Sequence, residues 1–173
     1  PNVLAQMAKR LEEAYPSELA IIDINMGCPA PKIVNNGEGS ALMKNMPLAA
    51  KIIERVSSAI KLPLTVKFRK GWDDASINAT HFARMAQESG AAAVTVHGRT
   101  RSQGYSGKAD WDIIGEVKAL LSIPVFGNGD IYCALDVLRL KAKTSCDGVL
   151  VARGAQGNPW IFSQIKAALN GYA

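Results

Sequence analysis

Residues 92–101 read AAVTVHGRTR, a short apolar run with β-branched residues that ends in a histidine, a glycine and further polar residues. An apolar run followed by polar residues occurs five times along the chain. The five runs are Leu19–Ile24, Leu62–Phe68, Ala92–Val96, Ile123–Phe126 and Gly148–Val151. Runs of this length and composition predict buried β-strands. The repeated unit therefore sets the fold.

Segments with helical periodicity lie between the predicted strands. They are Asn2–Ala14, a segment that starts at Pro47, a helix capped by Ser76 that stops at Gly90, Trp111–Leu121, Ala134–Leu140 and a last helix after Pro159. Strict alternation of helix and strand predicts parallel strands joined by crossover helices. Successive strands begin about 25 to 43 residues apart, close to the roughly 30 residues per unit of a (β/α)8 barrel.

Two parallel architectures fit this alternation, a (β/α)8 (TIM) barrel and a doubly wound sheet. The barrel is favoured because no predicted strand leads into a GxGxxG turn. A complete barrel needs about 250 residues, whereas this chain has 173. We therefore expect one α/β domain over residues 1–173, a partial barrel of about five parallel βα units that corresponds to strands 4–8, with the N-terminal strands absent.

The composition is that of a globular protein, with 48% hydrophobic and 20% charged residues and a mean hydropathy of +0.03. No apolar run reaches the roughly 18–20 residues that span a bilayer, so we expect no membrane association. Three cysteines, an odd number without a CxxC pair, predict a reducing, cytoplasmic location. The net charge of +5 permits contact with nucleic acid without requiring it.

Polar residues cluster where each predicted strand ends. The segments that follow the five runs are Asp23–Pro29, Lys67–Trp72, His97–Arg101, Gly127–Asp130 and Ala152–Gly157. In a (β/α)8 barrel the loops after the strands converge on one face, where active sites are built. The sequence therefore predicts a functional site at this face.

Two side chains within the predicted strands suggest an inward-facing polar surface. Lys67 alternates with Val66 and Phe68, so it is expected on the opposite face of the sheet, where a lysine needs an anion or an electron-rich ring. The alternative is a lysine that only reaches out to the barrel mouth. His97 is expected on the same face as Thr95, with a hydrogen-bonded core histidine as the alternative.

The last two loops predict a phosphate site. Gly127–Gly129 and Arg153–Gly154 are glycine-rich turns before predicted helices, and such turns let backbone N–H groups approach an anion. Barrels often bind phosphate at the loops after their last two strands. No metal site is expected, because the two histidines are not spaced as ligands and no carboxylate cluster accompanies them.

Together these motifs resemble the tRNA-dihydrouridine synthases, particularly their bacterial B-like branch. The matching segments, which span nearly the whole chain, are Asp23–Pro29, Val66–Trp72, Val96–Arg101, Gly127–Ile131 and Ala152–Trp160. The Asn-x-Gly-Cys-Pro and His-Gly-Arg-Thr-Arg elements are highly specific in combination. One departure is Ala152, where many relatives have glycine.

The resemblance implies an FMN-binding barrel followed by a small helical domain that grips RNA and is absent here. It implies an oxidoreductase that reduces the C5–C6 double bond of uridine in tRNA, uses NADPH to reload the flavin and is monomeric as the full-length enzyme. It implies Cys28 as the proton donor to uracil C5. The remaining implied roles are FMN binding by Lys67, His97, Asn128, Gly129, Asp130, Ala152 and Arg153, uracil contact by Asn25 and Arg69, and contact of Arg99 and Arg101 with RNA or the flavin phosphate.

The chemistry of the residues agrees with these implied roles. Reduction of a C=C bond needs a hydride, which side chains do not supply, and a proton from a group such as a neutral thiol. The basic residues Arg69, Lys70, Arg99 and Arg101 are expected to hold the RNA backbone. Two alternatives stay open, another FMN barrel that acts on free pyrimidines in the manner of dihydroorotate or dihydropyrimidine dehydrogenases, and a non-catalytic RNA-binding fragment.

Overall fold

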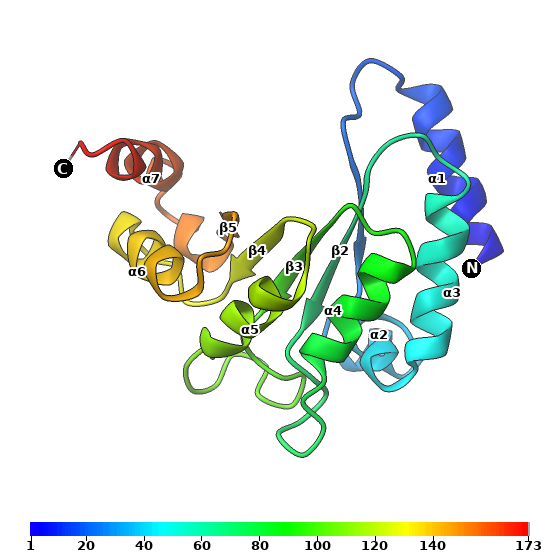
Figure 1. Ribbon diagram of the computed structural model, residues 1–173, viewed down its shortest axis with the longest axis horizontal. Helices are drawn as coiled ribbons and strands as arrows, with labels where there is room; N and C mark the ends of the chain where they lie inside the picture. The colour runs from blue at the N-terminus through cyan, green and yellow to red at the C-terminus, as the bar shows by residue number, and fades with distance from the viewer. Residues whose placement is uncertain (173) are drawn as a thin grey trace.

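The structure, a computed structural model, describes residues 1–172 and contains one parallel sheet (Figure 1). Its strands are β1 (Ile22–Asn25), β2 (Leu64–Arg69), β3 (Ala93–His97), β4 (Val125–Asn128) and β5 (Gly148–Leu150). They lie side by side in the order of the sequence. A doubly wound sheet reverses its strand order at a switch point, so the doubly wound alternative is wrong and the fold is a partial (β/α)8 barrel.

Helices cover one side of this sheet. The long helices are α1 (Asn2–Ala14), α3 (Met46–Ser57), α4 (Ala79–Glu88), α5 (Asp112–Leu120), α6 (Ala134–Thr144) and α7 (Ile161–Leu169). Three short helices, α2 (Pro31–Val34), η1 (Gly39–Lys44) and η2 (Arg153–Ala155), lie in the loops after β1 and β5. Right-handed crossovers between successive neighbouring strands place every connecting helix on the same face, and Figure 1 shows the helices along the outer side of the curved sheet.

The hydrophobic core lies between the sheet and these helices. Val66, Val94 and Val125 are register partners on three neighbouring strands and are fully buried. The ring of Phe68 on β2 packs against Phe82 of α4 with 4.9 Å between the ring centroids. Apolar side chains therefore alternate toward the helices and leave the other face of each strand for polar groups.

The local predictions were confirmed in part. Pro47 lies in the first turn of α3, where the Asn45 side chain accepts a hydrogen bond from the Leu48 N–H. Ser76 does not cap α4, because its hydroxyl donates to Asp73 at 2.6 Å and the helix begins only at Ala79. The helices α2 and η1 were not predicted.

Both outer strands of the sheet are open edges. Within residues 1–172, β1 pairs only with β2, and β5 pairs only with β4. The two ends of the chain lie at opposite ends of the molecule (Figure 1). Large apolar side chains are exposed beside these edges, among them Leu4, Met7 and Leu11 of α1 and Trp160 and Phe162 near α7. None of the helices in the described part of the chain is long and apolar enough to cross a membrane.

Candidate active site

The inner face of the sheet carries two rows of polar side chains. Strand register pairs Asn25 with Lys67 and Lys67 with Thr95 in one row. In the next row Arg69 pairs with His97, and His97 with Asn128. Since register partners in a sheet point to the same side, these groups face away from the helices. The predicted orientations of Lys67 and His97 follow from this pattern.

A pocket opens over these rows at the carboxyl ends of the strands. Its lining consists of Lys67, Arg69, His97, Tyr105, Asn128, Gly129, Asp130, Ile131, Tyr132, Leu150, Ala152 and Arg153. All seven residues predicted to bind the cofactor are among them. The pocket draws on β2, β3, β4 and β5 and on the loops that follow β3, β4 and β5, as expected for a barrel whose strand ends converge.

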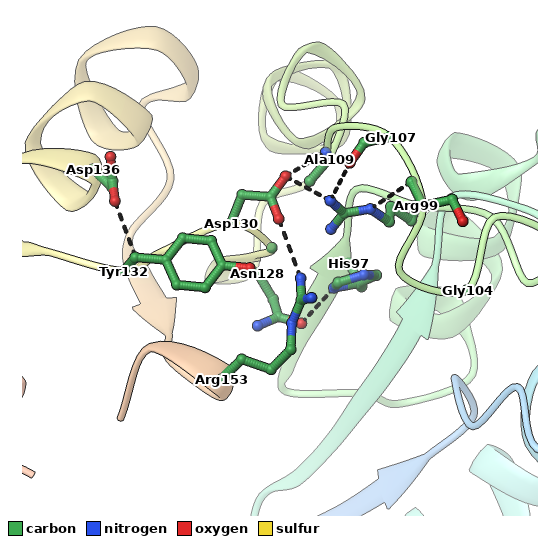
Figure 2. Close-up of polar contacts among 12 residues, drawn as sticks. His97, Arg99, Gly104, Gly107, Ala109, Asn128, Asp130, Tyr132, Asp136 and Arg153 are labelled. Atoms are coloured by element: carbon green, nitrogen blue, oxygen red, sulfur yellow. Dashed lines mark hydrogen bonds and ion pairs between the residues drawn. The ribbon is translucent and has the colours of Figure 1, made fainter. Parts of the chain in front are cut away.

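His97 is held in one orientation at the floor of this pocket (Figure 2). Its Nδ1 lies 2.7 Å from the side-chain oxygen of Asn128, whose amide group donates to the Leu150 carbonyl at 2.6 Å. Because the Asn128 oxygen can only accept, Nδ1 carries the proton and Nε2 is an acceptor. Nε2 is buried and has no hydrogen-bond partner among the described residues.

The charge state of His97 follows from its surroundings. Burial and the nearby Arg69 lower the pKa of His97 from 6.5 to about 4, against a raising contribution from the Asn128 hydrogen bond. The ring is therefore neutral at physiological pH and presents a bare nitrogen to the pocket. Such a nitrogen accepts a hydrogen bond from a hydroxyl or N–H group of a ligand.

Lys67 gives the pocket a second polar feature. Burial lowers the pKa of its ammonium group, Arg69 lowers it further, and Asp23 opposes the shift. Lys67 donates no hydrogen bond to the described residues, although a partly buried ammonium group is costly without a partner. The pocket thus offers an unused donor beside the bare acceptor of His97.

Asp130 joins two arginines at one end of the pocket (Figure 2). One oxygen accepts from Arg99 at 2.8 Å and from the Ala109 N–H at 2.7 Å, while the other lies 3.3 Å from Arg153. Burial raises the pKa of Asp130, but these hydrogen bonds and the arginine charges outweigh it and hold the pKa below its usual range. Two cations against one carboxylate leave this end positive.

Free backbone donors line the same end. The N–H groups of Gly129, Asp130, Ala152 and Arg153 make no hydrogen bond to other described residues. Backbone N–H groups in turns form anion-binding concavities. The predicted phosphate site thus has both free donors and excess positive charge.

The glycines in these turns also have a packing role that was not predicted. A Cβ at Gly154 would overlap the Ile131 carbonyl, and one at Gly129 would lie 2.7 Å from the Cβ of Ala109. Both glycines therefore allow neighbouring loops to touch. The turns also do not lead directly into long helices, because α6 begins at Ala134 and only the three-residue η2 follows Ala152.

Cys28 and Asn25 lie outside this pocket, in an apolar groove along the open edge of β1. Cys28 is half-buried, and its carbonyl accepts hydrogen bonds from the Ser40 N–H at 3.0 Å and hydroxyl at 2.9 Å. The Asn25 side chain accepts from the Gly27 N–H at 2.9 Å. The loop that carries the thiol is therefore fixed on both sides of Cys28.

Arg69 connects the thiol loop to the pocket. Its Nε donates to the Gly27 carbonyl at 2.8 Å, and one terminal nitrogen donates to Thr100 and Gly104 at 2.9 and 3.1 Å. The residue is only 4% exposed. No cation is adjacent to Cys28 in the sequence, whereas the fold brings this guanidinium to the neighbouring residue.

The predicted substrate-contact residues Arg99 and Arg101 differ in how many internal contacts their guanidinium groups make. Arg99 is 2% exposed and donates to the carbonyls of Ser106 and Gly107 as well as to Asp130. Arg101 instead lies over the ring of Trp72, 4.7 Å from its centroid. Arg99 thus holds a loop in place, whereas Arg101 forms no ion pair with an acid among residues 1–172.

Sequence reasoning missed Tyr105 and Tyr132, which flank Arg153. Its guanidinium carbon lies 4.5 Å from the centroid of Tyr105 and 5.6 Å from that of Tyr132. Tyr105 lies in the loop after β3 and Tyr132 in the loop after β4, and an aromatic residue in a strand-end loop was the available signal. No cluster of three or more potential metal ligands occurs within residues 1–172.

A parallel sheet in barrel order, with a positive, donor-rich pocket at its strand ends, defines a barrel-type α/β protein with a candidate site for an anionic ligand. The chain belongs to the dihydrouridine synthase family, whose family model matches residues 1–173. This membership decides against the alternative of a dihydroorotate or dihydropyrimidine dehydrogenase-like barrel.

Relatives and solved structures agree with this membership. A probable tRNA-dihydrouridine synthase of Rickettsia bellii is 52% identical over 95% of this chain and 50% of its own length. The tRNA-dihydrouridine synthase B of Pseudomonas putida is 47% identical over 84% of this chain and 43% of its own. The chain thus spans about half the length of the curated relatives it matches. Among solved structures, a mandelate oxidase is 20% identical with a TM-score of 0.64, covering 96% of this chain and 55% of that one, and shares the fold.

Proposed function

We propose that this chain is the flavin-binding and catalytic part of a tRNA-dihydrouridine synthase. The reaction is the reduction of the C5–C6 double bond of uridine in tRNA, with FMN as the bound cofactor and NADPH as the reductant. The relatives named above as tRNA-dihydrouridine synthases support this proposal. The same proposal makes the protein a cytoplasmic oxidoreductase.

The observation that carries the proposal is the set of unused polar groups in one pocket. Among the described residues, His97 Nε2 is a buried acceptor without a partner and Lys67 is a free donor, and the turns after β4 and β5 present free N–H groups beside Arg153. A flavin mononucleotide needs these complements, because it carries ring N–H and carbonyl groups, hydroxyls and a phosphate. In this proposal the phosphate binds at Gly129, Asp130, Ala152 and Arg153.

Ala152 is compatible with this phosphate site although many relatives have glycine there. Its backbone N–H makes no hydrogen bond to the described residues, and alanine keeps that donor. Its methyl group is the only addition. Phosphate binding therefore does not depend on glycine at this position.

When bound, FMN supplies the hydride that no side chain can provide. Cys28 gives its thiol proton to uracil C5, and the hydrogen bonds from Ser40 and to Asn25 keep the loop around that thiol in place. Asn25 lies next to Lys67 in register and is proposed to contact the uracil. Arg69 and Arg99, whose donors bind loop carbonyls, keep those loops in place around the substrate.

The open edges of the sheet are proposed to be covered by further βα units of the same barrel. The five strands described would then be strands 4–8, and the apolar faces beside β1 and β5 would be buried inside the closed, monomeric enzyme. A helical RNA-binding domain would follow the barrel.

The test is flavin content followed by activity. The holoenzyme is expected to absorb at about 450 nm and to convert uridine to dihydrouridine in unmodified tRNA when NADPH is added. A colourless protein that cannot be reconstituted with FMN would overturn the proposal and leave the non-catalytic RNA-binding alternative. Dihydrouridine mapping in tRNA from cells that lack the protein would identify the position modified.

A further inference from the structure

Four basic residues at the strand ends were candidates for contact with RNA, and three of them are already occupied. Arg69 and Arg99 are buried and donate to loop carbonyls. Lys70 is 8% exposed and lies 3.6 Å from Asp110. Cations with internal partners contribute little to an external anion. Arg101 is the one of these four whose side chain forms neither an ion pair nor a hydrogen bond in the described part of the chain.

A second free cation lies beside Arg101. The ammonium group of Lys44, at the end of η1, is 4.3 Å from the centroid of the Trp72 ring, and Arg101 contacts the same ring. Lys44 is exposed and likewise forms no ion pair with the described residues. Lys44, Trp72 and Arg101 come from the loops after β1, β2 and β3, so three strand ends meet in one basic group.

Backbone hydrogen bonds hold this group in place. The Arg101 N–H donates to the Gly71 carbonyl at 3.0 Å, and the Ser102 N–H donates to the Trp72 carbonyl at 2.9 Å. The Nε of Arg101 is buried and has no hydrogen-bond partner in the part of the chain that the structure describes. A cation over an aromatic ring keeps its full charge while its side chain loses conformational freedom. Both side chains are therefore largely ordered before a ligand binds, which reduces the entropy cost of binding.

We propose that Lys44, Trp72 and Arg101 form an RNA phosphate clamp that binds the tRNA backbone beside the catalytic pocket. This inference rests on the proposed function and names Lys44 and Trp72 as additional RNA-binding residues. Both cations contact the Trp72 ring, so Trp72 positions them rather than stacking on a base. The expected partner groups are phosphodiesters. Two cations that form no ion pair within the described residues attract phosphates, and such contacts do not depend on the base sequence of the RNA.

The geometry fits RNA better than a protein partner. The clamp sits on the face that carries the catalytic pocket, where the proposed substrate must dock. Its neighbours Asp73 and Asp74 are acidic, and Asp73 is occupied by the Ser76 hydroxyl. The clamp therefore offers two localised cations rather than a broad basic patch.

Binding of unmodified tRNA to the FMN-loaded holoenzyme tests the clamp. Lys44→Gln is expected to raise the Kd about three- to tenfold at 0.15 M salt and to lower the slope of log Kd against log salt by about 0.7–1, since one phosphate contact is lost. Trp72→Leu is expected to weaken binding as much or more, and Trp72→Phe to restore part of it. Lys51→Gln is the matched control, because it removes an exposed lysine from the outer helix α3.

The outcomes separate this inference from the proposed function. Flavin absorbance and NADPH oxidation are expected to be unchanged in every variant. If Lys44→Gln binds tRNA with the Kd and salt slope of the wild type, the clamp is wrong even though the enzyme still reduces uridine. A wild-type holoenzyme that oxidises NADPH but neither binds nor reduces tRNA would overturn the proposed function and the clamp together. Lys44 is exposed, so its variant reports on binding even if Trp72→Leu fails to fold.

Discussion

Buried arginines determine how the individual side chains of the site are arranged. Arg69 donates to carbonyls in the loops after β1 and β3, and Arg99 binds Gly107 further along the loop after β3 and Asp130 in the loop after β4. A guanidinium group carries five N–H donors in a fixed plane and so can connect several loops at once. These arginines were expected to face the substrate. Sequence reasoning located them at the right strand ends but had no means of showing which acceptors would take their donors.

Replacement of Cys28 is expected to separate reduction of the flavin by NADPH from reduction of uridine. Cys28→Ala should retain FMN and its reduction by NADPH, because the thiol lies outside the pocket proposed to bind FMN. Uridine reduction should fall by at least about a hundredfold, the usual contribution of a positioned acid. Rapid mixing with NADPH and then with tRNA measures both steps.

Cys133→Ala is the matched control, since it removes an exposed thiol at the start of α6. It should leave both steps unchanged. Wild-type tRNA reduction by Cys28→Ala would show that the proton comes from another group.

His97 makes the stability of the protein depend on pH. The folded state lowers its pKa to about 4 from 6.5, so between these values the unfolded chain binds a proton that the folded protein does not. Stability should therefore fall as the pH falls from 7 to 5, by about 2 kcal/mol from this residue. Urea denaturation at the two pH values measures the difference.

His97→Gln removes this titration while keeping a polar side chain. Its loss of stability between pH 7 and 5 should be smaller than that of the wild type by about the same 2 kcal/mol. An equal loss in both proteins would mean that His97 is protonated at pH 5 in the folded state.

Helices and strands with a strong hydrophobic periodicity were predicted from the sequence. Short helices that depend on tertiary contacts were not. All five strands and the six long helices occur where apolar runs and amphipathic segments indicated them. β1 begins at Ile22 rather than Leu19, because Ile22 is the first residue with a partner, Leu64, on β2. The helix η1 packs on the Cys28 loop through Ser40, a contact that local sequence does not encode.

The packing of adjacent loops can be tested at a glycine. Gly154→Ala would place a methyl group against the backbone of Ile131 and Tyr132, so the turns after β4 and β5 must separate. We expect a loss of about 1–3 kcal/mol in stability and weaker retention of FMN. Denaturant titration and flavin release measure the two effects.

Gly115→Ala gives the matched comparison within α5. The nearest atom to its Cβ is 3.5 Å away, and alanine favours a helix interior over glycine by up to about 1 kcal/mol. It should be neutral or stabilising and should leave flavin binding unchanged. Destabilisation by both variants alike would mean that added volume, rather than loop contact, decides the cost.

For the molecule as a whole, the strand order and the partial, open barrel were predicted, whereas the apolar surfaces beside its open edges were not. Alternating elements predicted parallel neighbours, and the sheet order confirms them. The exposed apolar faces beside β1 and β5 appear only in the folded arrangement, because α1 looks like any amphipathic helix in sequence. Unpaired edges of this kind associate with other strands.

Residues 1–173 alone are therefore expected to bind a hydrophobic dye and to self-associate. Replacing Leu4, Met7 and Leu11 with serine should reduce both effects, since these side chains line the groove beside β1. Dye fluorescence and light scattering measure the change. Gln6→Ser with Arg10→Ser alters exposed polar positions of the same helix and should have no effect. A monomer that binds no dye would contradict the proposed covering of these edges.

The loops at the strand ends are tied to one another. Arg101 and Ser102 hydrogen-bond to the loop after β2, and Arg69 joins the loops after β1 and β3. A surface connected in this way resists deformation, so for the proposed reaction the distortion falls on the nucleic acid. A uridine must leave its stack to reach the pocket, and uridines that unstack at low cost would be modified first. The choice of position would then reflect the mechanics of the tRNA fold as much as any direct reading of its bases.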